Sequence, residues 1–304
     1  KFGGVPMHDA PKETAPPEAP SPPPKFAGVG LVAGTLTGWA LMLALLKWWL
    51  ILPLAGLFIV SLLGDVQGVS LKKRLVAHVA VAVLLVAGAG LVDQSGWLAA
   101  LIALPLIVWA INLYGAMDGS DGLTAGMALI GFSAYGIGAI MANDDTLAMI
   151  CFTVGAAGLG FLYFSWPPAK AFMGAAGAAP LGFLAAALGL WGWQLGYWAI
   201  WFPLLVFSPF VVDASITLAK RVWRCSRKQC AGSGVEHYYQ RLLRMGWSPV
   251  RLARTEYVLM LVAAVSALTF VGEALPLPLL LLWGVIYLAL ALRIDAAWKK
   301  TEPR

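Results

Sequence analysis

Residues 112–124, with the sequence NLYGAMDGSDGLT, lie between two long apolar segments at 97–116 and 123–142. Asp118 and Asp121 are three residues apart, and a glycine follows each of them. A carboxylate at the edge of a membrane is costly, so such acids are functional candidates. Two of them beside flexible backbone could hold a divalent cation, which prefers oxygen ligands. The alternative is a solvated turn, because Asp-Gly is a common turn dipeptide.

The composition of the whole chain is that of a polytopic membrane protein. Of its 304 residues, 60% are hydrophobic and 12% are charged, and the mean hydropathy is +0.80. An apolar run of about 20 residues can cross a bilayer as a helix. We therefore predict an all-α bundle of about ten transmembrane helices. The expected spans are 27–46, 48–64, 75–92, 97–116, 123–142, 147–165, 175–192, 195–219, 254–272 and 276–294.

The distribution of charge predicts the orientation of this bundle. Alternating spans place both termini and the loops 65–74, 117–122, 166–174 and 220–253 on one side. All but Lys47 of the 21 Lys and Arg residues lie on that side. Because positive loops remain in the cytoplasm, this side is expected to be cytoplasmic. The net charge of +6 is thus a topology signal, and a nucleic-acid-binding protein is not indicated.

Three regions are expected along the chain. Residues 1–26 form a proline-rich cytoplasmic segment without a regular helix, and the chain is expected to start part-way into a longer protein. Residues 27–296 form the transmembrane domain, which includes the cytoplasmic loop 220–253. Residues 297–304 form a basic cytoplasmic tail. The cysteines, Cys151, Cys225 and Cys230, lack metal-ligand spacing, and plain thiols are favoured over zinc ligands.

The polar residues gather on the predicted cytoplasmic face. Carboxylates for a metal, together with Lys and Arg for phosphate oxygens, are what phosphoryl transfer requires. Topology and lipid-headgroup contact explain most of the basic residues equally well, and His237 is as compatible with an ordinary surface histidine. For His78, inside a span, a hydrogen bond between packed helices is favoured over catalysis. A transporter is disfavoured, because transporter sites lie near the middle of the membrane.

Four motifs resemble those of the polyprenyl-phosphate N-acetylhexosamine-1-phosphate transferases. This is glycosyltransferase family 4, which includes the undecaprenyl-phosphate GlcNAc-1-phosphate transferases and the phospho-N-acetylmuramoyl-pentapeptide transferases. Residues 112–124 resemble N-x-x-N-F-M-D-G-x-D-G-L-A, and residues 167–174 resemble P-P-A-K-I-F-M-G. Residues 210–218 resemble F-I-V-D-A-x-x-T-L, and residues 237–246 resemble the end of H-R-x-H-x-Y-Q-R-L-x-x-x-G. The motifs follow the family order over almost the whole chain.

The resemblance implies transfer of a HexNAc-1-phosphate from a UDP-sugar to polyprenyl (undecaprenyl) phosphate, with release of UMP. It also implies Mg²⁺ and a bacterial inner-membrane location with a cytoplasmic active face, and it leaves a homodimer open. Asp65 would activate or position the lipid phosphate, while Asp118 and Asp121 would orient the nucleotide and serve as metal ligands. The expected substrate-binding residues are Asn112, Lys72, Lys170, His237 and Arg241, the last two for diphosphate. We expect Asp65, Asp118, Asp121 and His237 to meet in one cleft.

The chain also departs from the family pattern at five positions. An acid is replaced by Gly64, an asparagine by Gly115, a metal-binding aspartate by Ala175, and a histidine and an arginine by Gly234 and Val235. Each change removes a group that could bind metal or phosphate, so weakened Mg²⁺ dependence and low turnover are predicted. The alternative function is a catalytically degenerate homologue that acts as a membrane scaffold or binds the lipid carrier.

Overall fold

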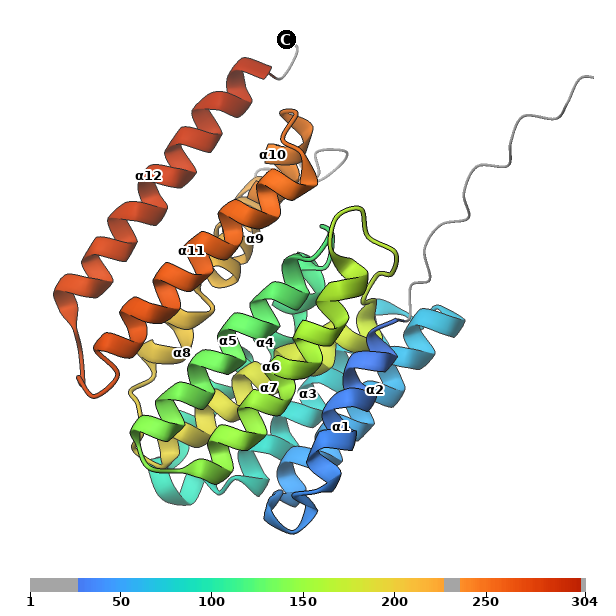
Figure 1. The fold of residues 1–304 in the computed structure, drawn as a ribbon, viewed down its shortest axis with the longest axis vertical. Helices are drawn as coiled ribbons and strands as arrows, with labels where there is room; N and C mark the ends of the chain where they lie inside the picture. Colours follow the sequence, from blue (N-terminus) through green and yellow to red (C-terminus); the bar gives the residue numbers. More distant parts are fainter. Residues whose placement is uncertain (1–26, 227–235, 302–304) are drawn as a thin grey trace, which may run out of the picture.

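The protein is a bundle of helices in the computed structural model, which describes residues 27–226 and 236–301 (Figure 1). Expectations for the proline-rich segment, Cys230, Gly234, Val235 and the last residues of the tail lie outside these ranges. Every regular element in the described residues is a helix. In order they are α1 Gly28–Ala40, the 3-10 helix Leu43–Leu45, α2 Trp48–Gln67, α3 Leu71–Gly88, α4 Leu91–Met117, α5 Leu123–Met141, α6 Asp145–Ser165, α7 Ala175–Gln194, α8 Trp201–Val206, α9 Ser208–Ser226, α10 Tyr238–Arg244, α11 Pro249–Thr269 and α12 Leu277–Thr301.

Seven helices in the described ranges are long and apolar enough to cross a membrane: α2, α4, α5, α6, α7, α11 and α12. The helical membrane bundle is thus confirmed, but the count of ten spans is not. Of the other three expected spans, the first gives α1, which has only 13 residues. The third gives α3, which has Lys72, Lys73 and Arg74 in its first turn. The eighth is divided between α8 and α9.

Proline explains the division of the eighth span. Pro209 is the second residue of α9, and proline is tolerated in the first turn of a helix but not in its interior. Pro209 also lacks the N–H that would continue the helix. The chain accordingly leaves helical geometry at Phe207, the single residue between α8 and α9.

The expected loop 65–74 is mostly helical. α2 continues to Gln67 and ends at Gly68, whose φ of 72° is in the left-handed region that favours glycine. α3 then begins at Leu71. Asp65 is therefore in the last turn of α2, and Arg74 is in the first turn of α3. The connection between the two helices is short enough to hold both residues near one end of the bundle.

The centre of the bundle is formed by α5 and α7, in which 72% and 83% of an 18-residue apolar stretch are buried. Helix α7 is rich in Ala and Gly, and small residues allow helices to approach closely within a membrane. A Cβ atom at Gly182 would overlap the backbone of Ala110 in α4. This close packing fixes the first residues of α7 beside the last residues of α4.

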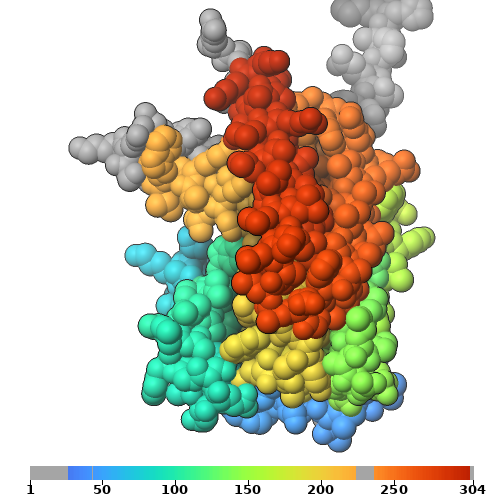
Figure 2. Space-filling model, turned by 90° about the vertical axis from the view of Figure 1, so that its left-hand side faces the viewer, coloured from blue at the N-terminus to red at the C-terminus, as the bar shows by residue number. Residues whose placement is uncertain are grey.

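Helices α11 and α12 form a hairpin along one side of the bundle, and α10 lies near its open end (Figure 1). α12 lies in front of α11 at the molecular surface (Figure 2), and only 17% of its 18-residue apolar stretch is buried. Its large exposed side chains include Leu281, Leu282, Val285 and Leu288. A helix exposed in this way is suited to a lipid environment.

Candidate functional site

The Asp65 carboxylate caps the start of α7. Its Oδ1 accepts a hydrogen bond from the backbone N–H of Ala175 at 3.2 Å, and Oδ2 accepts one from Ala176 at 2.8 Å. The first N–H groups of a helix have no partner within the helix, and the positive end of the helix dipole lies there. A carboxylate from the end of α2 therefore satisfies both donors, across 110 residues of sequence.

Asp118, the residue that follows α4, binds the same end of α7. Its Oδ2 accepts a hydrogen bond from the Gly174 N–H at 2.9 Å, and its Oδ1 accepts one from the Thr124 hydroxyl at 3.1 Å. Burial raises the pKa of Asp118 to about 6, and the nearby charge of Asp65 adds to this increase. The two hydrogen bonds act in the opposite direction. Asp118 can thus exchange a proton near neutral pH.

A cleft of about 350 Å³ opens between these carboxylates. Asp65 and Asp118 line it from the ends of α2 and α4, and the opposite wall is the start of α7. The other lining residues are Leu71, Arg74, His78, Ile111, Asn112, Gly115, Gly174, Ala175, Ala178 and Ala179. The cleft therefore combines two acids with a guanidinium, an imidazole and an amide, and is the candidate active site.

The replaced positions cluster in and around this cleft. Gly115 and Ala175 both line it, and the structure has open space where a side chain at Gly115 would project. A Cβ atom at Gly64 would lie 3.7 Å from Nε of Arg74. The structure thus shows where three of the missing family groups would lie, and each faces or adjoins the cleft.

These residues do not fit a Mg²⁺ ion held by protein carboxylates alone. No group of three His, Cys, Asp or Glu side chains in the described ranges could hold a metal ion. Asp65 and Asp118 already accept backbone hydrogen bonds from α7, and position 175 has no oxygen ligand. Magnesium usually requires carboxylates and substrate phosphates in octahedral geometry.

Asp121 occupies a neighbouring position outside the cleft lining. Its Oδ2 accepts a hydrogen bond from the backbone N–H of Ala169 at 3.0 Å, which attaches the 166–174 loop to the Asp-Gly-Ser-Asp-Gly turn. Lys170, in the same loop, extends over the ring of Tyr163 at 5.8 Å. Lys72 is exposed in the first turn of α3. Neither lysine lines the cleft in the described part of the chain.

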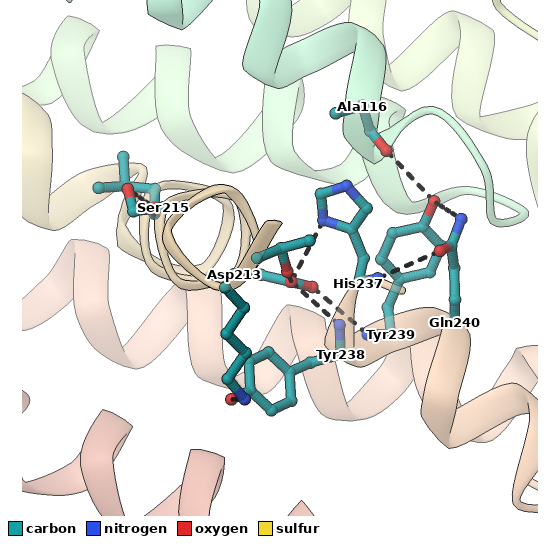
Figure 3. Close-up of polar contacts among 10 residues, drawn as sticks. Ala116, Asp213, Ser215, His237, Tyr238, Tyr239 and Gln240 are labelled. Carbon is teal, nitrogen blue, oxygen red and sulfur yellow. Dashed lines mark hydrogen bonds and ion pairs between the residues drawn. The ribbon is translucent and has the colours of Figure 1, made fainter. Parts of the chain in front are cut away.

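His237 belongs to a second polar cluster, which is organised by Asp213 (Figure 3). The Asp213 carboxylate accepts hydrogen bonds from the backbone N–H groups of Tyr238 at 3.0 Å and Tyr239 at 3.3 Å. Nδ1 of His237 lies 3.3 Å from the same carboxylate. Asp213 therefore caps α10 as Asp65 caps α7, and its neighbour His237 is directed toward it.

Arg241 is directed away from the cleft, toward α12. Its Nη1 donates to Asp295 at 2.7 Å, and Lys220 donates to the same carboxylate at 2.7 Å. Its guanidinium also lies over the ring of Trp298. In this arrangement Arg241 joins α10 to α12.

One hydrogen bond connects the two clusters. The Tyr239 hydroxyl donates to the carbonyl of Ala116 at 3.3 Å, two residues before Asp118 (Figure 3). Burial raises the pKa of Tyr239 to about 12, so the hydroxyl keeps its proton. α10 therefore rests on the Asp118 turn, and His237 lies at the same end of the bundle as the cleft without lining it.

Two polar residues that line the cleft, Arg74 and His78, were not among the expected site residues. They are four residues apart and lie on one face of α3. That relationship depends on knowing that the helix starts at Leu71. Composition alone favours a loop around the basic residues. Arg74 and His78 can be placed on one face only once the start of the helix is known.

Comparison with known proteins identifies relatives over much of the chain. The family model described as Glycosyl transferase family 4 matches residues 47–192, which include every residue that lines the cleft. A probable undecaprenyl-phosphate N-acetylglucosaminyl 1-phosphate transferase of Bacillus subtilis is 25% identical over 247 residues, covering 76% of this chain and 68% of the relative.

Two further relatives carry another transferase name. A phospho-N-acetylmuramoyl-pentapeptide-transferase of Levilactobacillus brevis is 33% identical, covering 68% of this chain and 62% of the relative. The protein of the same name from Listeria welshimeri is 32% identical, covering 58% of this chain and 53% of the relative. The chain thus spans between about half and two thirds of the length of these relatives.

Proposed function

The chain belongs to glycosyl transferase family 4, and from this we propose that it transfers a sugar-1-phosphate from a nucleotide sugar to a polyprenyl phosphate. We assign the donor to the UDP-N-acetylhexosamines, the acceptor to undecaprenyl phosphate and the released nucleotide to UMP. The names of the relatives support this class of reaction. The observation that carries the proposal is the cleft between Asp65 and Asp118, within the matched region.

In the proposed reaction, an oxygen of the lipid phosphate attacks the β-phosphorus of the UDP-sugar. A new P–O–P bond forms, and the bond between the β-phosphorus and the oxygen bridging to the α-phosphorus breaks. UMP leaves with that oxygen, and the lipid diphosphate sugar remains. The products require no oxidant, reductant or further reactant.

The side chains of the cleft have separate roles in this scheme. Asp118, with its pKa raised to about 6, accepts a proton from the attacking lipid phosphate when that phosphate is protonated. Asp65 fixes the start of α7, whose N–H groups and dipole form one wall. Arg74 supplies positive charge for phosphate oxygens, and Asn112 presents an amide. Because the described carboxylates do not fit a protein-held Mg²⁺ ion, no step is assigned to a metal, and weakened Mg²⁺ dependence stays a prediction.

We further propose that the cleft opens to the cytoplasm in a bacterial cell membrane. The proposal rests on the bias of Lys and Arg described above and on the location of Asp65, Asp118 and α10 at one end of the bundle. A nucleotide sugar could reach that end from the cytoplasm, while the lipid acceptor approaches from the bilayer. A homodimer remains a prediction.

The proposal is tested by measuring UMP release and formation of lipid diphosphate sugar. Membranes containing the chain receive undecaprenyl phosphate, Mg²⁺ and a panel of UDP-N-acetylhexosamines. We expect activity that Asp118→Asn reduces by about 100-fold or more, since a positioned acid–base group contributes about 10²–10⁴ in rate. Asp145→Asn is the matched control, because Asp145 is exposed at the opposite end of the bundle.

Absence of transfer to undecaprenyl phosphate from every donor of the panel would overturn the proposal. The alternative, a degenerate scaffold or lipid-carrier binder, would then apply. It is not favoured by the comparisons, since the matched relatives are named as transferases. Nevertheless, the replacements at Gly115 and Ala175 predict slow turnover.

A further inference from the structure

His78 is a buried group in the cleft that has no role in the mechanism above. It is located two turns into α3, and only 5% of its surface is exposed. Its ring lines the cleft together with Arg74 and Asn112. Nδ1 has no hydrogen-bond partner among the described residues.

An imidazole nitrogen without a partner is unfavourable inside a protein. Buried polar side-chain atoms are nearly always hydrogen-bonded, and an exception calls for an explanation such as a missing ligand. The helix-packing hydrogen bond favoured from the sequence is present, because the His78 ring bonds to the Asn112 side chain of α4, but it leaves Nδ1 without a partner in the described part of the chain. The free nitrogen indicates a group that enters the cleft.

The surrounding charges indicate what that group is. Arg74 lies one turn before His78 on the same face of α3, and no carboxylate in the described ranges forms an ion pair with it. The acids that face the cleft, Asp65 and Asp118, accept hydrogen bonds from the start of α7. The α3 wall therefore offers a guanidinium and an imidazole, which together match the oxygens of an anion.

We propose that His78 is a phosphate-binding residue, whose ring donates a hydrogen bond from Nδ1 to a phosphate oxygen of the substrate while Arg74 contacts the same group. The identity of the substrate rests on the proposed function. The phosphate could be that of the lipid acceptor or the diphosphate of the nucleotide sugar. Both present the same acceptor oxygens to the ring, and the experiment distinguishes them.

The chain has three histidines, so ¹⁵N-histidine labelling gives few NMR signals. The His78 signal of the full chain in detergent micelles is assigned by its loss in His78→Gln. Farnesyl phosphate and UDP-GlcNAc are then added separately, with farnesol and uridine as uncharged controls. We expect the Nδ1 signal to shift with at least one phosphate probe and with neither control. The probe that shifts it identifies the source of the phosphate.

Binding by variants provides the second measurement. Replacing a donor to a charged group weakens binding by about tenfold or more. We therefore expect His78→Phe to lose about tenfold in affinity for the active probe, whereas His78→Gln, which keeps an amide donor, stays within about threefold. Thr35→Val is the control, because its buried hydroxyl bonds to Leu31 within α1, outside the cleft.

The outcomes separate this inference from the proposed function. If no phosphate probe shifts the signal, or if His78→Phe binds both probes as the wild type does, the inference is wrong even when the enzyme is active. If a phosphate probe shifts the signal but no transfer occurs with any donor, the phosphate site stands and the transferase proposal fails.

Discussion

The carboxylate of Asp65 lies 3.2 Å from the backbone nitrogen of Ala175, the residue that stands where the family resemblance places a metal-binding aspartate. At position 175 the chain therefore contributes a backbone N–H donor to the cleft, and it lacks the carboxylate that an aspartate would supply there. Asp65 is used to hold α7, and the cleft lacks a third acid beside Asp65 and Asp118.

Ala175→Asp should create a metal-dependent site. Three carboxylates at the start of α7 would repel one another without a cation, so the variant should unfold at lower temperature than the wild type in EDTA. Saturating Mg²⁺ should reverse this loss, since ligand at about 100 times its Kd stabilises a protein by about 2.7 kcal/mol. Ala175→Asn is the neutral control. Equal effects of Mg²⁺ on Ala175→Asp and Ala175→Asn would contradict the prediction.

The pH profile of transfer should report the pKa of Asp118. The raised pKa of about 6 means that the carboxyl group is protonated below that value, so kcat should fall as pH decreases through about 6. Thr124→Val removes a hydrogen bond that lowers this pKa, and the inflection should move to higher pH. Asp118→Asn should abolish it. An inflection that Thr124→Val leaves in place would assign the titration to another group.

The same raised pKa has an effect on folding stability. The pKa of Asp118 is higher in the folded protein than in the unfolded chain, so protonation of Asp118 stabilises the fold. This contribution to the free energy of unfolding is fully present below the unfolded pKa and is lost as pH rises through about 6.

Asp213→Ala should loosen α10. The substitution removes the acceptor for the N–H groups of Tyr238 and Tyr239 and the partner of His237. Losing a helix cap costs about 0.5–2 kcal/mol, and unpaired buried donors add to that. Hydrogen exchange at Tyr238 and Tyr239 should therefore accelerate at least tenfold. Asp145→Ala is the control, and unchanged protection in Asp213→Ala would show that α10 is held by other contacts.

Asp295→Ala should destabilise the junction of α9, α10 and α12. Arg241 is only 6% exposed, and the loss of its carboxylate partner leaves a buried charge, which typically costs about 3–5 kcal/mol. Asp295 is itself partly exposed, so the loss should be at the lower end of that range. Arg244→Ala breaks an ion pair on a residue that is mostly exposed and should change stability by about 1 kcal/mol or less. Chemical denaturation of both variants measures the difference, and equal losses would refute the distinction.

The 220–253 loop and both chain ends should face the cytoplasm. A cysteine at Ser233, which lies outside the described residues, should react with a membrane-impermeant maleimide only after the cells are permeabilised. A variant without the native cysteines is the background. Labelling in intact cells would reverse the proposed orientation.

Much of the fold could be predicted from the sequence, because long apolar runs are directly visible and seven of them are membrane-length helices. Helix ends were less predictable. The sequence predicts a polar loop that contains Asp65 and the basic residues after it. In the structure α2 extends past Asp65, and α3 begins before the basic residues. Local charge conceals a helix whose stability depends on packing against α4 and α7.

The candidate site was partly predictable, because some of its residues belong to motifs that are visible in the sequence. Asp65 and Asp118 were identified from motif spacing, and both line the cleft. That Asp65 caps α7 could not be predicted, because the cap joins residues 110 positions apart. Arg241 resembles a diphosphate ligand in sequence, yet its partner is Asp295 on the last helix, a contact that only the tertiary arrangement creates.

The close approach of Gly182 to Ala110 limits how the cleft can change shape. With no side chain between them, the backbones of α4 and α7 are in direct contact at this point, so we expect the two walls that they contribute to keep a nearly constant separation. We therefore expect any widening that admits a substrate or releases a product to come from α3, which lines the cleft through Arg74 and His78. The Gly68 turn at its beginning has the backbone freedom to act as the hinge. Replacing Gly68 would thus be expected to slow entry and exit while leaving the catalytic side chains in place.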